Sequence, residues 1–311
     1  MTQIRIASRG SQLALSQSSE IRARLLELDP TLDISIVKIT TQGDTDKSDY
    51  LHQARSVGMF TSEVQNALLD HRADLAVHSF KDLPTTGPGE LTTAAIPLRE
   101  SAADVLISRH RVPAGLTDLP SGSTVGTSSL RRIAQVRQLR PDLQCQPLRG
   151  NIETRLHKVT SGQVESIIIA HAGLNRLDLS DHISAVLNID QFIPAPAQGA
   201  LAIQTRTDDA PLRALVEQLD HSPTRIAVTT ERQVLAQLHG GCSIPLGVHA
   251  TIDNDNTLIL RAVLSSVDGK QQIRHRLSGP ANQGLELATD MAQYLLDQGA
   301  QELLSQIRLD K

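Results

Sequence analysis

The sequence predicts an α/β protein that ends in a small α+β domain with a three-stranded antiparallel sheet. Over the first two thirds of the 311 residues, short β-branched runs alternate with helical patterns. This alternation is typical of βαβ units and mostly parallel sheets. Near residue 222 the pattern changes to a long helix, three strands and a closing helix. The length suits two domains, or three small ones.

In the first part, the clearest helix runs from Ser11 to about Leu28. It places Ile21, Leu25 and Leu28 on one face and ends at Asp29-Pro30. A further helix and four strands are expected in this part: the helix at Thr61–Arg72, and the strands at Ile4–Ala7, Ile34–Thr40, Asp74–Ser79 and Leu91–Ile96.

A second set of elements begins with a strand at Asp104–Ser108. The segment Ile193–Gly199, rich in proline and alanine, indicates a crossing of the chain between domains. The other expected elements are strands at Thr124–Gly126, Leu143–Leu148, Ser166–Ala170 and Ala200–Thr205, a helix that stops at Pro141, and a helix at Ile152–Thr160 closed by Gly162.

The last part begins with a helix at Thr224–Leu238 that ends at Gly240-Gly241. Asp268-Gly269 is a hairpin signal between the second and third of three strands. These strands are expected near Gly247–Ile252, Thr257–Leu264 and Gln271–Leu277, followed by one helix from about Leu285 to Ile307.

Composition excludes several classes of protein. The net charge is −4 and aromatic residues make up only 2%, without tryptophan, which disfavours nucleic-acid binding. The first residues, MTQIRIASRG, have no apolar core, so no secretory signal is expected, and no apolar run reaches the ~20 residues that a membrane span requires. Two cysteines are too few for a disulfide scaffold or a cysteine-rich zinc site, and HExxH is absent. We therefore expect a cytoplasmic protein with no metal, membrane or nucleic-acid partner.

Positive charge nevertheless gathers in residues 126–158, which hold seven Arg and Lys residues against two acidic ones. Arg131 and Arg132 follow the helix opening at Gly126, and Arg155 lies one turn inside a helix that Asn151 is expected to cap. Helix starts bind anions, and arginine suits carboxylates and phosphates. Because the phosphate-loop pattern is missing, carboxylates are favoured. The alternative is a solvated basic face.

Two further side chains are candidates for chemistry. Asp82 follows the end of a strand, where a carboxylate can stabilise a developing cation or act as acid or base; alternatively, it only shapes a turn. Lys81 is a second anion contact or a surface lysine. Cys242 follows two glycines, a permissive loop that can present a thiol, or it is a small buried residue. Cys145, in a strand, is interpreted as structural.

Eight ordered segments, covering nearly the whole chain, together resemble the porphobilinogen deaminase (hydroxymethylbilane synthase) family. They are Arg9-Gly-Ser-Gln-Leu-Ala, Thr41-Gln-Gly-Asp44, Ala76-Val-His-Ser-Phe-Lys-Asp-Leu-Pro84, Gly126-Thr-Ser-Ser-Leu-Arg-Arg132, Leu148-Arg-Gly-Asn-Ile-Glu-Thr-Arg155, Ala172-Gly-Leu174, Pro194-Ala-Pro-Ala-Gln-Gly-Ala-Leu201 and Gly240-Gly-Cys-Ser-Ile-Pro-Leu-Gly247.

The resemblance implies two α/β domains of the type II periplasmic-binding-protein kind, at 1–98 plus 199–218 and at 99–198, and a third domain at 219–311. It implies a monomeric transferase of porphyrin and heme biosynthesis with a dipyrromethane cofactor attached as a thioether to Cys242. Four molecules of the small substrate porphobilinogen would be joined head to tail, each losing ammonia, before hydrolysis releases hydroxymethylbilane.

The resemblance also assigns roles to residues. Asp82 is the implied catalytic residue, which would hold pyrrole N–H groups and stabilise the cation left by the loss of ammonia. The implied cofactor contacts, besides Cys242 and Asp82, are Lys81, Thr127, Ser129, Arg131, Arg132 and Arg155. The implied substrate contacts are Arg9, Ser11, Arg149 and Arg176.

Four positions depart from the family's usual pattern. Val57 and Ser62 stand where relatives carry lysines, Ala103 replaces an arginine, and Ala197 replaces a glycine. The missing cations leave open a second hypothesis, a non-catalytic carboxylate-binding protein on the same scaffold. A third hypothesis is an unrelated cysteine hydrolase, since the chain has 11 histidines that could pair with a thiol.

Overall fold

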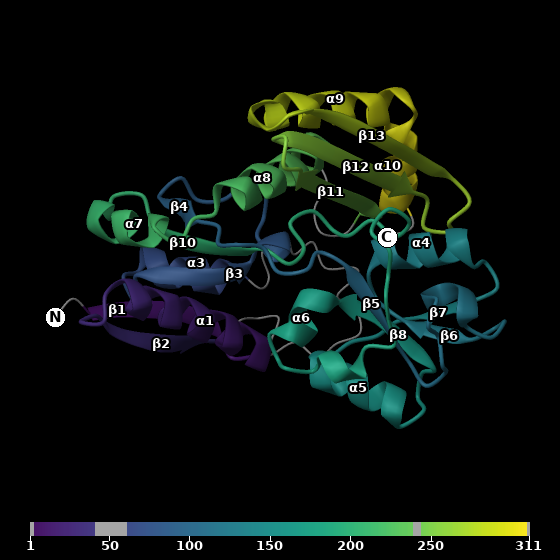
Figure 1. Cartoon of the computed structure of the whole chain (residues 1–311), viewed down its shortest axis with the longest axis horizontal. Helices are drawn as coiled ribbons and strands as arrows, with labels where there is room; N and C mark the ends of the chain where they lie inside the picture. The colour runs from purple at the N-terminus through teal and green to yellow at the C-terminus, as the bar shows by residue number, and fades with distance from the viewer. Residues whose placement is uncertain (1–2, 41–60, 239–243, 310–311) are drawn as a thin grey trace. The chain divides into compact units, whose positions relative to one another are not determined.

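The computed structural model describes residues 3–40, 61–238 and 244–309 (Figure 1). The chain divides into two compact units. The first unit comprises Met1–Glu100 and Ala200–Arg225, and the second comprises Ser101–Gly199 and Ile226–Lys311. The expected division into three domains, with its boundaries, stays a prediction.

The first unit is built on a five-stranded sheet of order β2-β1-β3-β10-β4. β1 is parallel to β2 and β3, whereas β10 is antiparallel to β3 and β4. The strands are β1 (Gln3–Arg9), β2 (Asp33–Ile39), β3 (Leu75–Ser79), β4 (Leu91–Ala95) and β10 (Leu201–Arg206), and the helices are α1 (Gln12–Leu28), α3 (Ser62–Leu69) and α7 (Ala210–Glu217).

Alternate residues of β1 and β3 face different cores of this unit. Ile6 and Leu75 pack in one cluster with Leu25 of α1. Ala7 and Ala76 pack in another with residues of α3. The sheet is thus covered on both faces. This is why the sequences of its buried strands are largely apolar.

The second unit contains another five-stranded sheet, of order β7-β6-β8-β5-β9. β6 is parallel to β7 and β8, and β5 is antiparallel to β8 and β9. The strands are β5 (Asp104–Ser108), β6 (Thr124–Gly126), β7 (Gln144–Gln146), β8 (Ser166–Ala170) and β9 (Ala185–Val186), and the helices are α4 (Leu130–Leu139), α5 (Ile152–Thr160) and α6 (His171–Asn175).

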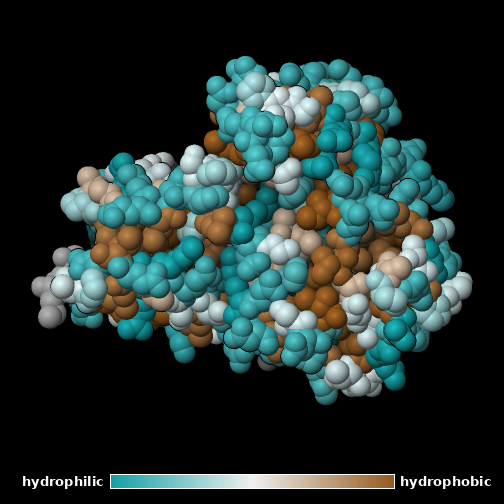
Figure 2. Space-filling model, viewed as in Figure 1, coloured by the Kyte–Doolittle hydropathy of each residue, from teal (hydrophilic) through white to brown (hydrophobic). Residues whose placement is uncertain are grey.

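The second unit also holds the three-stranded antiparallel sheet β11-β12-β13. Alternate residues Leu258, Leu260 and Leu264 of the central strand are buried in one core with Met291 and Leu295. The elements here are β11 (Leu246–Ile252), β12 (Thr257–Ser265), β13 (Gln272–Pro280), α9 (Gly284–Asp297), α10 (Ala300–Leu309) and, from Ile226 onward, α8 (Ser222–Gln237). On the face shown in Figure 2, hydrophilic side chains predominate and hydrophobic ones form separate patches.

The predicted fold class is confirmed, with two α/β sheets and a separate antiparallel sheet. The cap at Asn151 is confirmed, since its side chain accepts a hydrogen bond from the Thr154 backbone N–H. The hairpin at Asp268-Gly269 is also confirmed: Gly269 has a φ of +77° and joins β12 to β13.

In each five-stranded sheet four strands run in the same direction, as the expected mostly parallel arrangement requires, but the reversed strands β10 and β5 were not foreseen. Two other expectations about the elements are wrong. The single C-terminal helix is two helices, because Gly299 between α9 and α10 has a φ of +96°, which a helix cannot accommodate. The sequence interpretation also missed α6, α7 and the two-residue strand β9.

Candidate functional site

In the first unit, four predicted site residues follow two neighbouring strands. Arg9 ends β1 and Ser11 caps α1, while Lys81 and Asp82 lie in a 3-10 turn after β3. Because β1 and β3 are parallel and paired, their carboxyl ends lie at the same edge of the sheet. In open α/β sheets this edge is where ligands bind.

Two buried neighbours anchor the turn that carries Asp82. Phe80 is buried, and its backbone N–H donates to the Ala200 carbonyl at 3.0 Å. Leu83, on the other side of Asp82, is also buried, whereas Asp82 itself is exposed. Two buried apolar anchors therefore present one exposed carboxylate. Ser11 is the N-cap of α1, and its hydroxyl accepts a hydrogen bond from the Ala14 N–H at 3.3 Å.

His78 lies four residues before Asp82 and was missed in the sequence interpretation. It is 5% exposed, and among the described residues its Nε2 has no hydrogen-bond partner. Burial lowers the pKa of this imidazole to about 4, although a hydrogen bond with Gln204 opposes the shift. The ring is therefore neutral near pH 7. The only signal of His78 in the sequence was its position as a polar residue within the largely apolar strand Leu75–Ser79.

Replacing His78 with glutamine is expected to flatten the pH dependence of stability. The folded pKa is about 4 against an ordinary 6.5, so between these values the unfolded chain binds a proton that the folded chain does not. The free energy of unfolding of the parent should therefore fall as the pH drops from about 6.5 to about 4, by about 2 kcal/mol at pH 5. His78→Gln removes that loss.

Urea unfolding near pH 7 and near pH 5 measures the effect. His182→Gln, at an exposed position, is the control and should keep the slope of the parent. An unchanged slope in His78→Gln would show that the buried imidazole is not its source.

In the second unit, seven predicted site residues follow β6, β7 and β8, whose carboxyl ends also share one edge. Thr127 is buried, and its hydroxyl accepts from the Ser129 N–H at 3.3 Å. Arg176 follows α6 and donates through Nη2 to the Gly199 carbonyl at 3.0 Å. Arg149 precedes α5 and is half-buried.

Arg155 is half-buried in the first turns of α5. Its Nε donates to the Gly150 carbonyl at 2.8 Å, and no carboxylate of the described residues forms an ion pair with it. Burial, and then the positive charge of Arg132, lower its pKa to about 10. The guanidinium remains charged at neutral pH, and an anion beside it would relieve both causes of the shift.

Arg131 and Arg132 lie deeper than the sequence suggested. They are 4% and 7% exposed, and both pair with Asp104, which is fully buried. Arg131 Nη1 lies 2.7 Å from Asp104 Oδ2, and Arg132 Nη2 lies 2.7 Å from Oδ1. Burial alone would raise the pKa of Asp104, but the two guanidinium groups outweigh it and hold that pKa well below its usual value.

One carboxylate does not balance these arginines. Arg131, Arg132 and Asp104 together carry one excess positive charge, and Arg131 Nε is buried without a hydrogen-bond partner among the described residues. Desolvated charge without a counter-ion is costly. The donor set therefore suits an anionic group such as a carboxylate.

Two of the four departures from the usual pattern lie beside this cluster. Ala103 is buried, and its carbonyl accepts from the His171 N–H at 3.0 Å. Ala197 is fully buried with a φ of +58°, a conformation that favours glycine. Ser62 is the first residue of α3. Val57 and the predicted cofactor cysteine, Cys242, lie outside the described residues.

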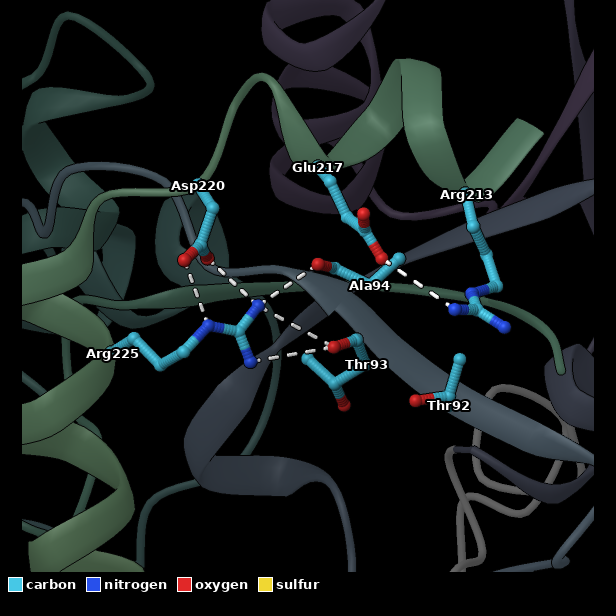
Figure 3. A pocket seen from close by; sticks show the side chains of 7 residues that line it. All are labelled: Thr92, Thr93, Ala94, Arg213, Glu217, Asp220 and Arg225. Carbon is cyan, nitrogen blue, oxygen red and sulfur yellow. Dashed lines mark hydrogen bonds and ion pairs between the residues drawn. The ribbon is translucent and has the colours of Figure 1, made fainter. Parts of the chain in front are cut away.

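A pocket of the first unit is separate from all the predicted site residues. Its two arginines are already paired, Arg225 with Asp220 at 2.8 Å and Arg213 with Glu217 at 3.8 Å (Figure 3). Thr92, Thr93 and Ala94 complete its wall. With its charges compensated, this pocket offers no excess charge to a ligand.

No helix of the described residues is both long and apolar enough to cross a membrane. They contain no group of three or more His, Cys, Asp and Glu side chains that could hold a metal ion.

Solved structures with some similarity to this chain include a methionine-binding protein, MetQ. It is 13% identical with a TM-score of 0.43, and the match covers 70% of this chain and 89% of that one. A periplasmic sulfonate-binding protein from Methylobacillus flagellatus is 11% identical with a TM-score of 0.40, over 77% of this chain and 68% of that one.

Sequence comparisons are far more specific. Residues 4–214 match the family model "Porphobilinogen deaminase, dipyromethane cofactor binding domain", and residues 225–297 match "Porphobilinogen deaminase, C-terminal domain". A porphobilinogen deaminase of Syntrophobacter fumaroxidans is 42% identical over 98% of this chain and 97% of its own. One from Desulforudis audaxviator is 42% identical over 97% of each. The chain belongs to the porphobilinogen deaminase family.

Proposed function

We propose that this chain is a transferase that condenses four porphobilinogen molecules, with loss of one ammonia from each, onto a dipyrromethane primer held on Cys242. Hydrolysis then releases hydroxymethylbilane for porphyrin and heme biosynthesis. Family membership supports this activity over the non-catalytic carboxylate-binding alternative and over an unrelated hydrolase. We further propose that the enzyme acts as a monomer in the cytoplasm.

The observation that carries the proposal is the excess of buried positive charge around Asp104. A dipyrromethane with its acetate and propionate groups bears four carboxylates, so it matches a cluster with more guanidinium groups than acids. Arginine suits this task because its fork binds carboxylates in a bidentate way. When bound, the dipyrromethane would supply the free pyrrole α-carbon to which the first porphobilinogen is joined.

Asp82 has the proposed catalytic role. Departure of ammonia from the aminomethyl group of porphobilinogen leaves an electron-poor cation, and a nearby carboxylate lowers the energy of that developing charge. The carboxylate can also accept hydrogen bonds from pyrrole N–H groups and so orient the ring. Its exposed position on a turn anchored by Phe80 and Leu83 supports this role.

The remaining family positions have proposed binding roles. Lysine, arginine and hydroxyl side chains would hold the cofactor, and a second set would hold the incoming substrate or the growing chain. The cofactor set is Lys81, Thr127, Ser129, Arg131, Arg132 and Arg155, and the substrate set is Arg9, Ser11, Arg149 and Arg176.

Intact-protein mass tests the proposed tether. The purified protein is expected to be heavier than its sequence by one dipyrromethane, provided that the expression host makes the precursor. Cys242→Ser should lose this increment and all turnover, because no thiol remains to form the thioether. The chain offers a matched control in its other cysteine. Cys145→Ser should keep both, and an increment that survives Cys242→Ser would contradict the attachment.

A further inference from the structure

We propose that Asp104 is a positioning residue, which orients the guanidinium groups of Arg131 and Arg132 toward the carboxylates of the bound primer. Asp104 has no assigned role in the reaction and does not itself need to touch a substrate. The inference rests on the proposed function, because it concerns the two arginines to which a cofactor-binding role is given there.

The topology places Asp104 at the edge of the sheet where the binding residues gather. It is the first residue of β5, and β5 is antiparallel to β8. Asp104 is therefore paired with Ala170, the last residue of β8. Because β5 runs in the reverse direction, its first residue, Asp104, lies at the edge where the parallel strands β6, β7 and β8 end.

Each oxygen of the Asp104 carboxylate accepts hydrogen bonds from a different arginine. Oδ2 accepts from Arg131 Nη1 at 2.7 Å. Oδ1 accepts from Nη2 of Arg132 at 2.7 Å and from its Nε at 3.1 Å. Charge-assisted bonds of this length are the strong ones, so they fix the direction of both arginines.

Backbone carbonyls complete the orientation. Arg131 Nη1 also donates to the Ile193 carbonyl at 2.9 Å, and Arg132 Nη1 donates to the Ile168 carbonyl at 3.0 Å. Gln198 braces the carboxylate itself, since its Nε2 donates to Asp104 Oδ1 at 3.0 Å and to the Ala102 carbonyl at 2.8 Å. Five hydrogen bonds, three to Asp104 and two to backbone carbonyls, thus determine where the two flexible arginine side chains point.

The two arginines are held differently. Asp104 occupies the Nε–Nη2 side of Arg132, the side that forms a two-point contact with a carboxylate. In Arg131 it occupies Nη1 only, and Nε is left without an acceptor among the described residues. Arg131 therefore keeps unused hydrogen-bonding capacity, while Arg132 contributes its charge in a fixed place.

Without Asp104 this arrangement would not hold. Two neighbouring buried cations repel each other, and long side chains that lose their partners regain rotamer freedom. A ligand would then bind arginines that first have to be ordered, which costs affinity and precision. Asp104→Asn keeps the shape of the side chain but removes its charge, and its amide NH₂ faces guanidinium N–H groups.

The test compares Asp104→Asn with the parent in two readouts. Intact mass gives the fraction of chains that carry the primer, and steady-state kinetics gives kcat per loaded chain and KM. We expect Asp104→Asn to be loaded on fewer than about half of its chains, and its kcat to fall about tenfold or more with KM changed less than about threefold. Misplaced primer contacts affect the chemical step more than they affect capture of substrate.

Two further variants keep the test decisive. Asp142→Asn breaks an Arg–Asp pair at the solvent-exposed end of α4 and should match the parent in both readouts. Gln198→Met removes one brace and leaves all three charges in place, so loading and kcat should fall in the same direction but less. If Asp104→Asn does not fold, as judged by urea unfolding, Gln198→Met decides the question.

Parent-like loading and kcat in a folded Asp104→Asn, or in Gln198→Met where only that variant folds, would overturn the inference while leaving the proposed function intact. A parent chain with neither primer nor turnover would contradict the proposed function, and the inference with it.

Discussion

Replacing Asp82 with asparagine is expected to lower porphobilinogen turnover about 10²–10³-fold while the primer stays attached. The amide has nearly the same shape as the carboxylate, so the turn anchored by Phe80 and Leu83 should persist. What is lost is the negative charge that stabilises the cation formed when ammonia leaves. Binding of the primer depends on several arginines as well, and therefore survives.

Turnover is measured from porphobilinogen consumption, and primer retention from intact mass. Asp33→Asn is the matched control, since Asp33 is also exposed but begins β2 at the opposite edge of the same sheet. It should behave as the parent does. Parent-like turnover in Asp82→Asn would show that Asp82 is not a catalytic residue.

The largest expected loss of stability comes from Glu231→Gln. Glu231 is fully buried in α8, and its carboxylate accepts from the backbone N–H groups of Ala197 at 2.6 Å and Ala250 at 2.8 Å. It thereby joins the helix, the segment before β10 and the strand β11 within the second unit. In the glutamine variant, an NH₂ group would face one of these N–H donors. Hydrogen bonds to charged groups are worth about 1.5–3 kcal/mol each, so we expect a loss of about 3 kcal/mol.

Urea unfolding at neutral pH measures this loss. Glu286→Gln makes the same chemical change at an exposed position in α9 and should alter the free energy of unfolding by less than about 0.5 kcal/mol. Equal midpoints for the two variants would mean that the Glu231 carboxylate does not join these segments.

Much of the fold could be predicted because its signals are local. The run Ser166–Ala170 is wholly apolar apart from its first residue, and a buried strand is the consequence. Asn151 and Gly269 act through their own side chain or backbone, so a cap and a turn could be located from a few neighbouring residues. Asp82 could be placed at a strand end for the same reason.

The features that were missed depend on residues distant in sequence. No local pattern shows that β10 returns antiparallel beside β3, more than a hundred residues earlier in the chain. The acceptor of Arg131 and Arg132 is Asp104, 27 and 28 residues away. A charged residue directly before the apolar run Val105–Ile107 was its only signal. The burial of His78 in β3 likewise depends on elements distant in sequence, such as the neighbouring strand β10.

Successive growth of one covalent chain is the central claim, and a mass series tests it most directly. Purified protein mixed with limiting porphobilinogen should show a ladder of intact masses, each step heavier by one porphobilinogen less one ammonia. The ladder should be absent from Cys242→Ser and should stop at the first steps in Asp82→Asn. Consumption of porphobilinogen without any change in the mass of the protein would contradict the account.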